Sequence, residues 1–206
     1  PWPLASTRPT PGNSKRAEPY ISHLAAAHRL ALAYADAWSD SFYVRQLSCF
    51  EAWSPRQRLT KVAADSLRIA GNAALGTSGA AAALRAWRES YRLARSIGDS
   101  AGQGSALGNI AVAWYRDGSL DSAEHYLRRS RAIAERIGDT RTRLNAIGTL
   151  ASDAKDRNDF ALARTLYSNA LELRSRIGDD RGAAADENNL GLVAEAVGDT
   201  AGARKY

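Results

Sequence analysis

Residues 97–139 read IGDSAGQGSALGNIAVAWYRDGSLDSAEHYLRRSRAIAERIGD, and the Ile-Gly-Asp tripeptide at both ends of this stretch returns at 177–179. The three copies are therefore forty residues apart. Other positions keep the same phase, and alanine stands at 83, 123, 163 and 203. A fixed period of this length indicates stacked supersecondary units, so the sequence predicts a solenoid.

Each forty-residue unit divides into two predicted helices. Within the quoted stretch, apolar residues recur at three- and four-residue steps over 100–116 and again over 120–137. Gly138 then supplies the left-handed conformation that ends a helix, which a residue with a Cβ adopts at a cost of about 1 kcal/mol. Asp139 or Thr140 would cap the helix that follows.

Small residues explain how the two helices of a unit pair. Ala111 on the first helix and Ala123 on the second would face each other, which lets the helix axes approach to about 8 Å. Larger apolar residues flank this contact and would form the layer between units: Leu107, Ile110, Trp114, Tyr126, Leu127 and Ile133. The sequence therefore predicts an all-α solenoid of antiparallel helix pairs.

The first third of the chain is predicted to differ from the repeats. Five of the six prolines lie in residues 1–20, which we expect to form an extended arm without regular structure. A helical pattern covers 21–38, and a second short helix is predicted over 41–53. A further helix over 55–75 begins with Ser54 as its N-cap and a proline at its first position.

Three regions follow from this pattern: the arm 1–20, helices within 21–63 that cap the array, and repeats over 64–206. The predicted repeat units are 64–103, 104–143, 144–183 and a truncated 184–206. The last unit stops at Tyr206, inside its second helix. This suggests a truncated chain or a partner that supplies the cap.

The composition excludes several classes of protein. The 206 residues are 45% hydrophobic and 24% charged, a globular balance that argues against disorder. No apolar run approaches the ~20 residues that a membrane-spanning helix needs. A single cysteine excludes a disulfide framework and a thiolate metal cluster, and three histidines leave little for a zinc site.

The positive charge of the chain is uneven. The formal net charge is +6, and residues 1–62 carry eight Lys and Arg against four Asp and Glu. Within the repeats, arginines alternate with acids at helical spacing, as in Asp121, Glu124, Arg128 and Arg129. This pattern is typical of a solvated helix face, whereas a nucleic-acid site needs a concentrated basic face with stacking aromatics. We therefore expect no nucleic-acid partner, and nucleic-acid binding through the basic first third is the third hypothesis, which predicts a steep loss of affinity with salt.

At these positions the units resemble the tetratricopeptide repeat. The resemblance is carried by Leu107-Gly-Asn-Ile110-Ala111 with Ala123, by Ile147-Gly-Thr-Leu150-Ala151 with Ala163, by Asn189-Leu190-Gly191 with Ala203, and more weakly by Leu67-Arg-Ile-Ala70-Gly71 with Ala83. It covers about 64–206, and the unit length is similar to that of kinesin light chains and spindle-orientation scaffolds. Ile-Gly-Asp replaces the proline that often ends the family's unit. The resemblance implies a right-handed superhelix.

In that family the first helix of each pair lines a concave surface that binds peptides. By position, Asn109, Thr149 and Asn189 form one row there, similar to the asparagine ladder that holds a ligand's backbone. Asparagine can donate and accept at once, so it can satisfy a peptide backbone without reading its sequence. The alternative is that these residues simply face solvent. The full set implied for this surface is Arg68, Asn72, Asn109, Tyr115, Arg116, Asn145, Thr149, Ser152, Lys155, Asn188 and Asn189.

Several patterns look like active sites but have better explanations. Residues 98–102, Gly-Asp-Ser-Ala-Gly, match a nucleophile elbow. That motif needs a strand before it, and the residues before Gly98 are predicted to form a helix instead. Residues 102–108 match a dinucleotide loop only loosely and lack its βαβ context. Cys49 with His28 could pair as nucleophile and base, but a lone cysteine in a helix is more often a core residue. The acids within 179–187 lie at a helix start, where they cap the helix rather than bind a metal.

The sequence therefore predicts a non-catalytic scaffold that binds a peptide or a partner subunit, with no cofactor and no metal. It would dock through the concave surface, the arm or the uncapped last repeat. The alternative is the regulatory front end of a longer bacterial enzyme, such as a CHAT-type protease whose active site lies outside this chain. We expect a soluble chain, cytoplasmic by default, and one cysteine is also compatible with a processed exported chain.

Overall fold

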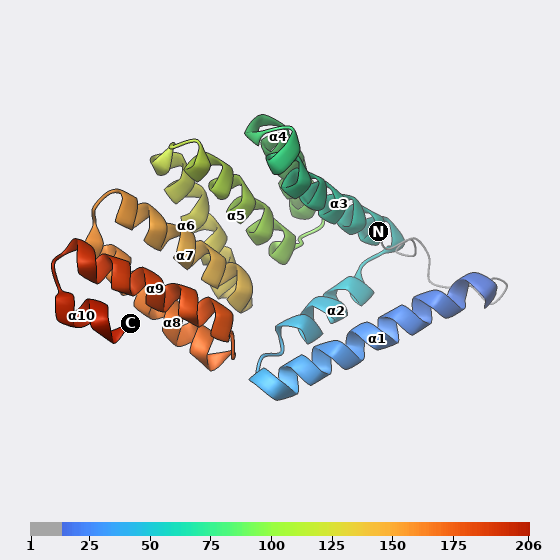
Figure 1. Cartoon of the computed structure of the whole chain (residues 1–206). Helices are drawn as coiled ribbons and strands as arrows, with labels where there is room; N and C mark the ends of the chain where they lie inside the picture. The colour runs from blue at the N-terminus through green and yellow to red at the C-terminus, as the bar shows by residue number, and fades with distance from the viewer. Residues whose placement is uncertain (1–13) are drawn as a thin grey trace.

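The computed structural model describes residues 14–206, with side chains from residue 23 onward. This part of the chain forms ten α-helices and contains no strand. The helices follow one another in consecutive pairs, which confirms the predicted all-α solenoid (Figure 1). Their bounds are α1 (Ser14–Trp38), α2 (Phe42–Ala52), α3 (Pro55–Thr77), α4 (Ala80–Ser96), α5 (Ser100–Arg116), α6 (Leu120–Ile137), α7 (Thr140–Asp156), α8 (Phe160–Arg176), α9 (Asp180–Ala196) and α10 (Thr200–Lys205).

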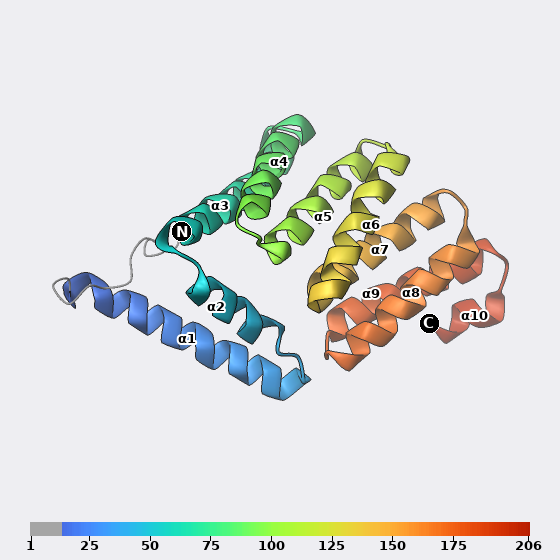
Figure 2. The same cartoon turned by 180° about the vertical axis from the view of Figure 1, so that it is seen from behind.

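Four pairs make up the repeated part of the chain: α3 with α4, α5 with α6, α7 with α8, and α9 with α10. The second helix of each pair also packs against the first helix of the next pair, so the pairs form a row (Figure 2). The helices predicted over 100–116 and 120–137 are confirmed as α5 and α6. The predicted unit boundaries at 104, 144 and 184 fall one turn inside α5, α7 and α9, because the physical boundary is the turn before each helix.

The Ile-Gly-Asp tripeptide forms that turn. Gly138 ends α6 with a φ of 69°, in the left-handed region, as the sequence predicts. Asp139 caps α7, and its carboxylate accepts a hydrogen bond from the backbone N–H of Thr142 at 3.0 Å. The same geometry recurs at 98–99 and 178–179. Because glycine takes a positive φ without strain and aspartate satisfies a free N–H, each copy ends one helix and starts the next.

Alanines and larger side chains fill the interiors of the first three repeated pairs. Ala111 and Ala123, which are predicted to face each other, are both fully buried. Trp87, Leu127 and Tyr167 occupy equivalent positions on α4, α6 and α8, and each is 1% exposed. The buried residues continue from one pair into the next, so the core is a layer along the array rather than a single centre.

Helix α1 begins at Ser14, seven residues before the predicted start at Ile21. The predicted extended arm is therefore wrong for residues 14–20, and residues 1–13 lie outside the described part of the chain. The prediction treated Pro19 as incompatible with a helix. Pro19 is the sixth residue of α1, where it removes one backbone hydrogen bond without ending the helix.

Helices α1 and α2 pack on each other but do not stack on α3 as a further pair, which differs from the predicted capping role of 21–63. Ser54, which precedes Pro55, is extended with φ −60° and ψ 159°. A residue before proline avoids the helical conformation, which separates α3 from α2 at this point. Because no preceding pair stacks on α3, Ala73 of α3 is exposed, whereas the equivalent Ala113 of α5 is buried.

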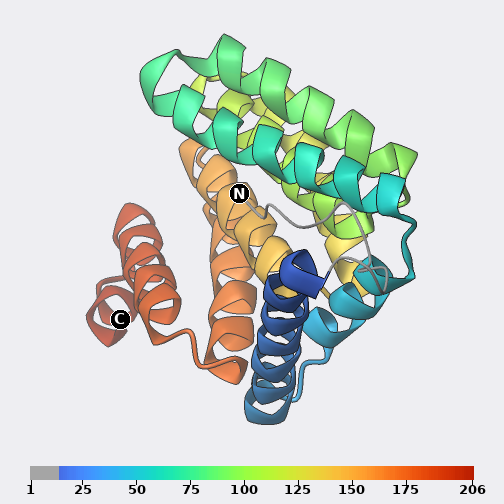
Figure 3. The same ribbon diagram turned by 90° about the vertical axis from the view of Figure 1, so that its right-hand side faces the viewer.

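The α1–α2 hairpin instead reaches the turns that follow α6 and α8 (Figure 3). Arg45 Nη2 donates a hydrogen bond to the backbone carbonyl of Ile137 at 3.2 Å. The ring of Trp38 lies against Gly178 so closely that a Cβ there would overlap it. The hairpin therefore runs along the edge of the array that the Ile-Gly-Asp turns form.

One junction between pairs buries a carboxylate. Asp153 of α7 is 4% exposed, at the position where α5 has Ala113 and α9 has Val193. Arg157 Nε lies 3.1 Å from Asp153 Oδ2, and Arg157 Nη1 lies 2.9 Å from Asp121 Oδ1 on α6. Burial raises the pKa of Asp153 above its usual value, and this effect exceeds the lowering by Arg157. The free energy of unfolding therefore falls as the pH rises from the ordinary value of 3.8 through the raised pKa.

Asp153→Ala is expected to raise the free energy of unfolding at pH 7 by about 1 kcal/mol, because Arg157 keeps Asp121 as a partner. The gain should shrink as the pH falls through the raised pKa toward 3.8, and stay small below 3.8, where the carboxyl is protonated in both states. Urea denaturation at several pH values measures this. Asp121→Ala is the control, since its side chain is 95% exposed, and should change stability by less than about 0.5 kcal/mol. A less stable Asp153→Ala protein at pH 7 would show that the ion pair outweighs burial.

Gly178→Ala is expected to release the hairpin from the array. The new Cβ would overlap the Trp38 ring, and the φ of 64° adds backbone strain of about 1 kcal/mol. Gly98→Ala is the matched control. Gly98 has a φ of 72° in the equivalent turn of an earlier unit, and a Cβ there would have no neighbour within 4 Å. Native-state hydrogen exchange should accelerate in α1 and α2 only for Gly178→Ala. Equal exchange in the two variants would contradict the docking of the hairpin.

Candidate functional site

The first helices of the first three repeated pairs lie closer to one another than the second helices do. Helix α3 contacts α5 and α5 contacts α7, whereas no comparable contact joins α7 to α9, α4 to α6 or α6 to α8. An array of this kind curves toward its first helices, so their free sides form its inner side. We call the eleven predicted residues, from Arg68 to Asn189, the inner face. None of them is buried.

Asn72 and Asn109 form the best-defined part of the inner face. Asn109 Nδ2 on α5 donates a hydrogen bond to Asn72 Oδ1 on α3 at 2.9 Å. Trp87 Nε1 on α4 donates to the same oxygen at 3.1 Å and to the carbonyl of Arg68 at 3.1 Å. Three helices therefore hold the two amides in one orientation. Trp87 was not among the predicted site residues, although its position fifteen residues after Asn72 was visible in the sequence.

The same spacing recurs in the third pair. Ser152 Oγ on α7 lies 3.0 Å from the hydroxyl of Tyr167, which stands fifteen residues later on α8. Ser152 Oγ also donates to the carbonyl of Gly148 at 3.1 Å. Burial raises the pKa of Tyr167 above its usual value. Ser152 therefore fastens the two helices of its pair, and its hydroxyl is already engaged.

The predicted row of Asn109, Thr149 and Asn189 is not uniform. All three residues are half-buried on consecutive first helices, as their shared phase predicts. Thr149 Oγ1, however, donates to the carbonyl of Asn145 at 2.9 Å within its own helix. Asn189 and its neighbour Asn188 form no hydrogen bond with any residue in the described range 14–206. The row therefore offers a free side-chain amide at Asn189 on α9 and a free amide oxygen at Asn109 on α5. The Thr149 hydroxyl between them is bonded to its own helix.

A second link between first helices lies farther along the inner face. The hydroxyl of Tyr115 on α5 donates to Asp156 Oδ2 on α7. Burial raises the pKa of Tyr115, and the hydrogen bond and negative charge of Asp156 raise it further. Arg116 and Lys155 flank this pair in sequence, and neither has an ion pair with a residue that the structure describes. Asp156 could not be predicted from the repeat pattern, because the equivalent positions of the other units carry no acidic residue.

The patterns that resembled active sites lie in helical surroundings. Ser100 is the first residue of α5 and follows helix α4, so the strand that a nucleophile elbow needs is not in front of it. Cys49 is exposed on α2, so the expectation that it is a core residue is wrong. Within residues 14–206 no three His, Cys, Asp or Glu side chains gather where they could hold a metal ion. None of the described helices combines the length and the apolar character needed to cross a membrane.

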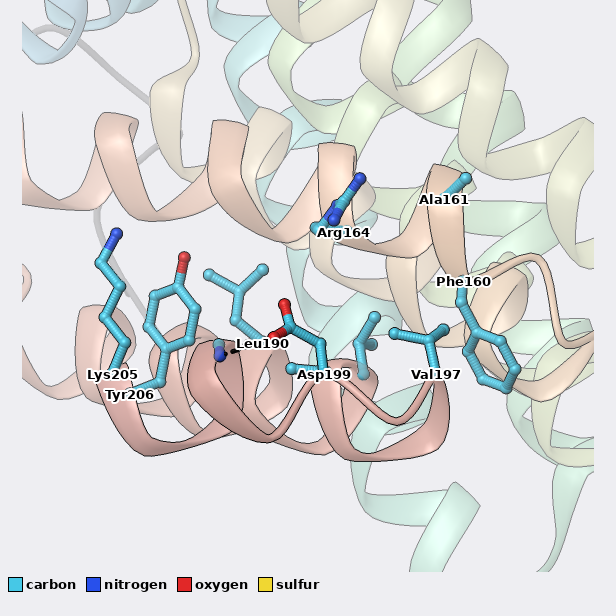
Figure 4. A pocket seen from close by; sticks show the side chains of 11 residues that line it. Phe160, Ala161, Arg164, Leu190, Val197, Asp199, Lys205 and Tyr206 are labelled. Carbon is cyan, nitrogen blue, oxygen red and sulfur yellow. Dashed lines mark hydrogen bonds between the residues drawn. The ribbon is translucent and has the colours of Figure 1, made fainter.

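A pocket of about 450 Å³ lies apart from the inner face, between α8, α9 and α10 (Figure 4). Ala194, one of its lining residues, stands where α5 has Trp114 and α7 has Ala154. Its wall also includes apolar side chains and two cations: Phe160, Leu190, Val193, Val197, Arg164 and Lys205. No predicted inner-face residue lines it.

No protein-family model matches the sequence, and no curated protein matches it. Among solved structures, the chain is similar to BtubC (BKLC) from P. vanneervenii, a kinesin-light-chain-like helical repeat protein, with 14% sequence identity and a TM-score of 0.64. The similarity covers 94% of this chain and 79% of BtubC. The forty-residue tetratricopeptide variety stays a prediction. What the similarity shows is the fold, and this chain shares the helical-repeat architecture of BtubC.

Proposed function

We propose that the chain is a non-catalytic scaffold that binds an extended peptide segment of a partner protein on its inner face. The arrangement of Asn72 and Asn109 carries the proposal. Asn72 Oδ1 already accepts two hydrogen bonds, which leaves Asn72 Nδ2 and Asn109 Oδ1 for another molecule. One donor beside one acceptor fits the alternating N–H and C=O groups of an extended backbone.

Trp87 gives this arrangement its rigidity. Its indole is 1% exposed and donates to both Asn72 and the Arg68 carbonyl. A side-chain amide that is held in place before binding loses little conformational freedom when a ligand arrives. The amide pair is therefore prepared for a backbone ligand by the core of the first pair.

The rest of the inner face supports a segment that spans several pairs. Asn189 on α9 offers a free amide, and Tyr115 with Asp156 forms a polar link between α5 and α7. Arg116 and Lys155 add positive charge near that link. A peptide that crosses these helices would contact side chains from three or four pairs, so its affinity would depend on the spacing of the array.

Replacing Asn109 and Asn189 together with alanine is expected to weaken peptide binding by about tenfold, since two backbone contacts are lost. The probe is a labelled peptide selected from a random peptide library on the unaltered protein and measured by fluorescence anisotropy. Asn169→Ala is the control, because Asn169 is exposed on α8, a second helix. Circular dichroism should show unchanged helicity in both variants.

Three results would contradict the proposal. One is a selected peptide whose affinity is the same for the double variant and for the unaltered chain. Another is an equal loss of affinity in Asn169→Ala, which would place the peptide on the outer side of the array. Failure of the library to yield any peptide that binds would also count against a peptide-binding inner face.

A further inference from the structure

Four arginines form a stripe along one side of α4. Arg85, Arg88, Arg92 and Arg95 are separated by three, four and three residues, so they share one side of the helix over a length of about 15 Å. All four are exposed. Trp87 and the other buried residues of α4 lie on the opposite side and pack into the array. The stripe therefore faces outward, away from the inner face.

Three of these arginines carry charge that the fold does not neutralise. Arg92 pairs with Glu89 through two bonds, Nε to Oε2 at 2.8 Å and Nη2 to Oε1 at 2.6 Å. Arg85, Arg88 and Arg95 form no hydrogen bond or ion pair with any residue from 14 to 206. The helix dipole favours a cation only at Arg95, in the last turn.

The neighbouring second helix extends the positive surface. Arg129 of α6 lies over the ring of Tyr91 on α4, with its guanidinium carbon 5.8 Å from the ring centre. Arg129 Nη2 also donates to the hydroxyl of Tyr91 at 3.1 Å. We call the resulting patch the arginine face, and it consists of Arg85, Arg88, Arg92, Arg95 and Arg129.

The repeat itself does not require this charge. Forty residues later, at the positions of the four α4 arginines, α6 carries His125, Arg128, Ala132 and Glu135, and eighty residues later α8 carries Thr165, Ser168, Glu172 and Ser175. The three second helices fold in the same way. Like charges at these spacings destabilise a helix, so α4 keeps its stripe at a cost to its own stability. A surface that lowers stability without any structural gain points to a binding partner.

We propose that the arginine face binds an acidic segment of a partner protein, one rich in aspartate and glutamate. The Arg92–Glu89 pair shows that a carboxylate can meet a guanidinium on this face in the two-bond geometry that the group favours. Carboxylates three or four residues apart on a partner helix have the same spacing as the stripe.

Two features of the face favour carboxylates over a nucleic acid. Tyr91, the aromatic residue beside the stripe, is covered by Arg129 and is not free to stack on a base. Glu89 places a negative charge among the arginines, which would repel a continuous phosphate backbone. The proposal is independent of the inner face, because the stripe lies on the other side of the array and both surfaces can be occupied together.

The test compares two triple variants that lower the formal net charge equally. One carries Arg85→Gln, Arg88→Gln and Arg95→Gln, and the control carries Arg176→Gln, Arg181→Gln and Arg204→Gln. All six arginines are exposed and have no ion pair with a described residue. Fluorescence anisotropy measures binding of a labelled helical peptide of glutamate and alanine, and of oligo(dT) with the same formal charge. Circular dichroism checks that both variants keep their helicity.

The α4 triple variant should bind the acidic peptide about tenfold more weakly than the unaltered chain, while the control should stay within about twofold. The unaltered chain should bind the peptide more tightly than the oligonucleotide at the same salt concentration. An equal loss in the control would assign the binding to net charge alone. Equal or tighter binding of oligo(dT) would assign the face to nucleic acid. If the unaltered chain did not bind the peptide at low salt, the arginine face would not be a site for acidic segments. Each of these results overturns the proposal.

Discussion

The close approach of the two helices within each pair is the constraint on which the rest of the structure depends. A small residue on the first helix meets a large one on the second. In the first pair a Cβ on Gly71 would overlap the ring of Trp87, so glycine is the residue that leaves room for the indole. In the second pair the smaller Leu127 stands at the equivalent position and Ala111 replaces the glycine. The repeat thus conserves volume within a pair rather than residue identity.

This packing also organises the polar surface of the array. The second helix of each pair covers one side of the first helix of the next pair. The polar residues of the first helices are therefore left on their inner side. Trp87 belongs to both parts of the structure. Its ring fills the interior of the first pair, and its N–H orients Asn72, which in turn orients Asn109. The packing of the core therefore sets the geometry of the candidate binding surface.

The repeated part of the fold could be predicted because its signals are local and recur. Gly138 and Asp139 mark a helix end and a helix start within two residues, and the structure places both boundaries there. The position of the α1–α2 hairpin could not be predicted, because the contact of Trp38 with Gly178 joins distant residues without any period. The row of amides was predicted by phase but not in detail. Thr149 turns its hydroxyl back to its own helix, which is a competing hydrogen bond that spacing does not reveal.

The most direct test of the stacked-pair architecture is the stability of Ala123→Leu against Ala132→Leu, measured by equilibrium urea unfolding. Both alanines lie on α6, but Ala123 is fully buried and Ala132 is exposed. Overpacking at Ala123 should lower the free energy of unfolding by about 1–3 kcal/mol, while the change at Ala132 should stay within about 0.5 kcal/mol. Equal stabilities for the two variants would show that the helices do not meet through this alanine, and the assigned packing of every pair would then be wrong.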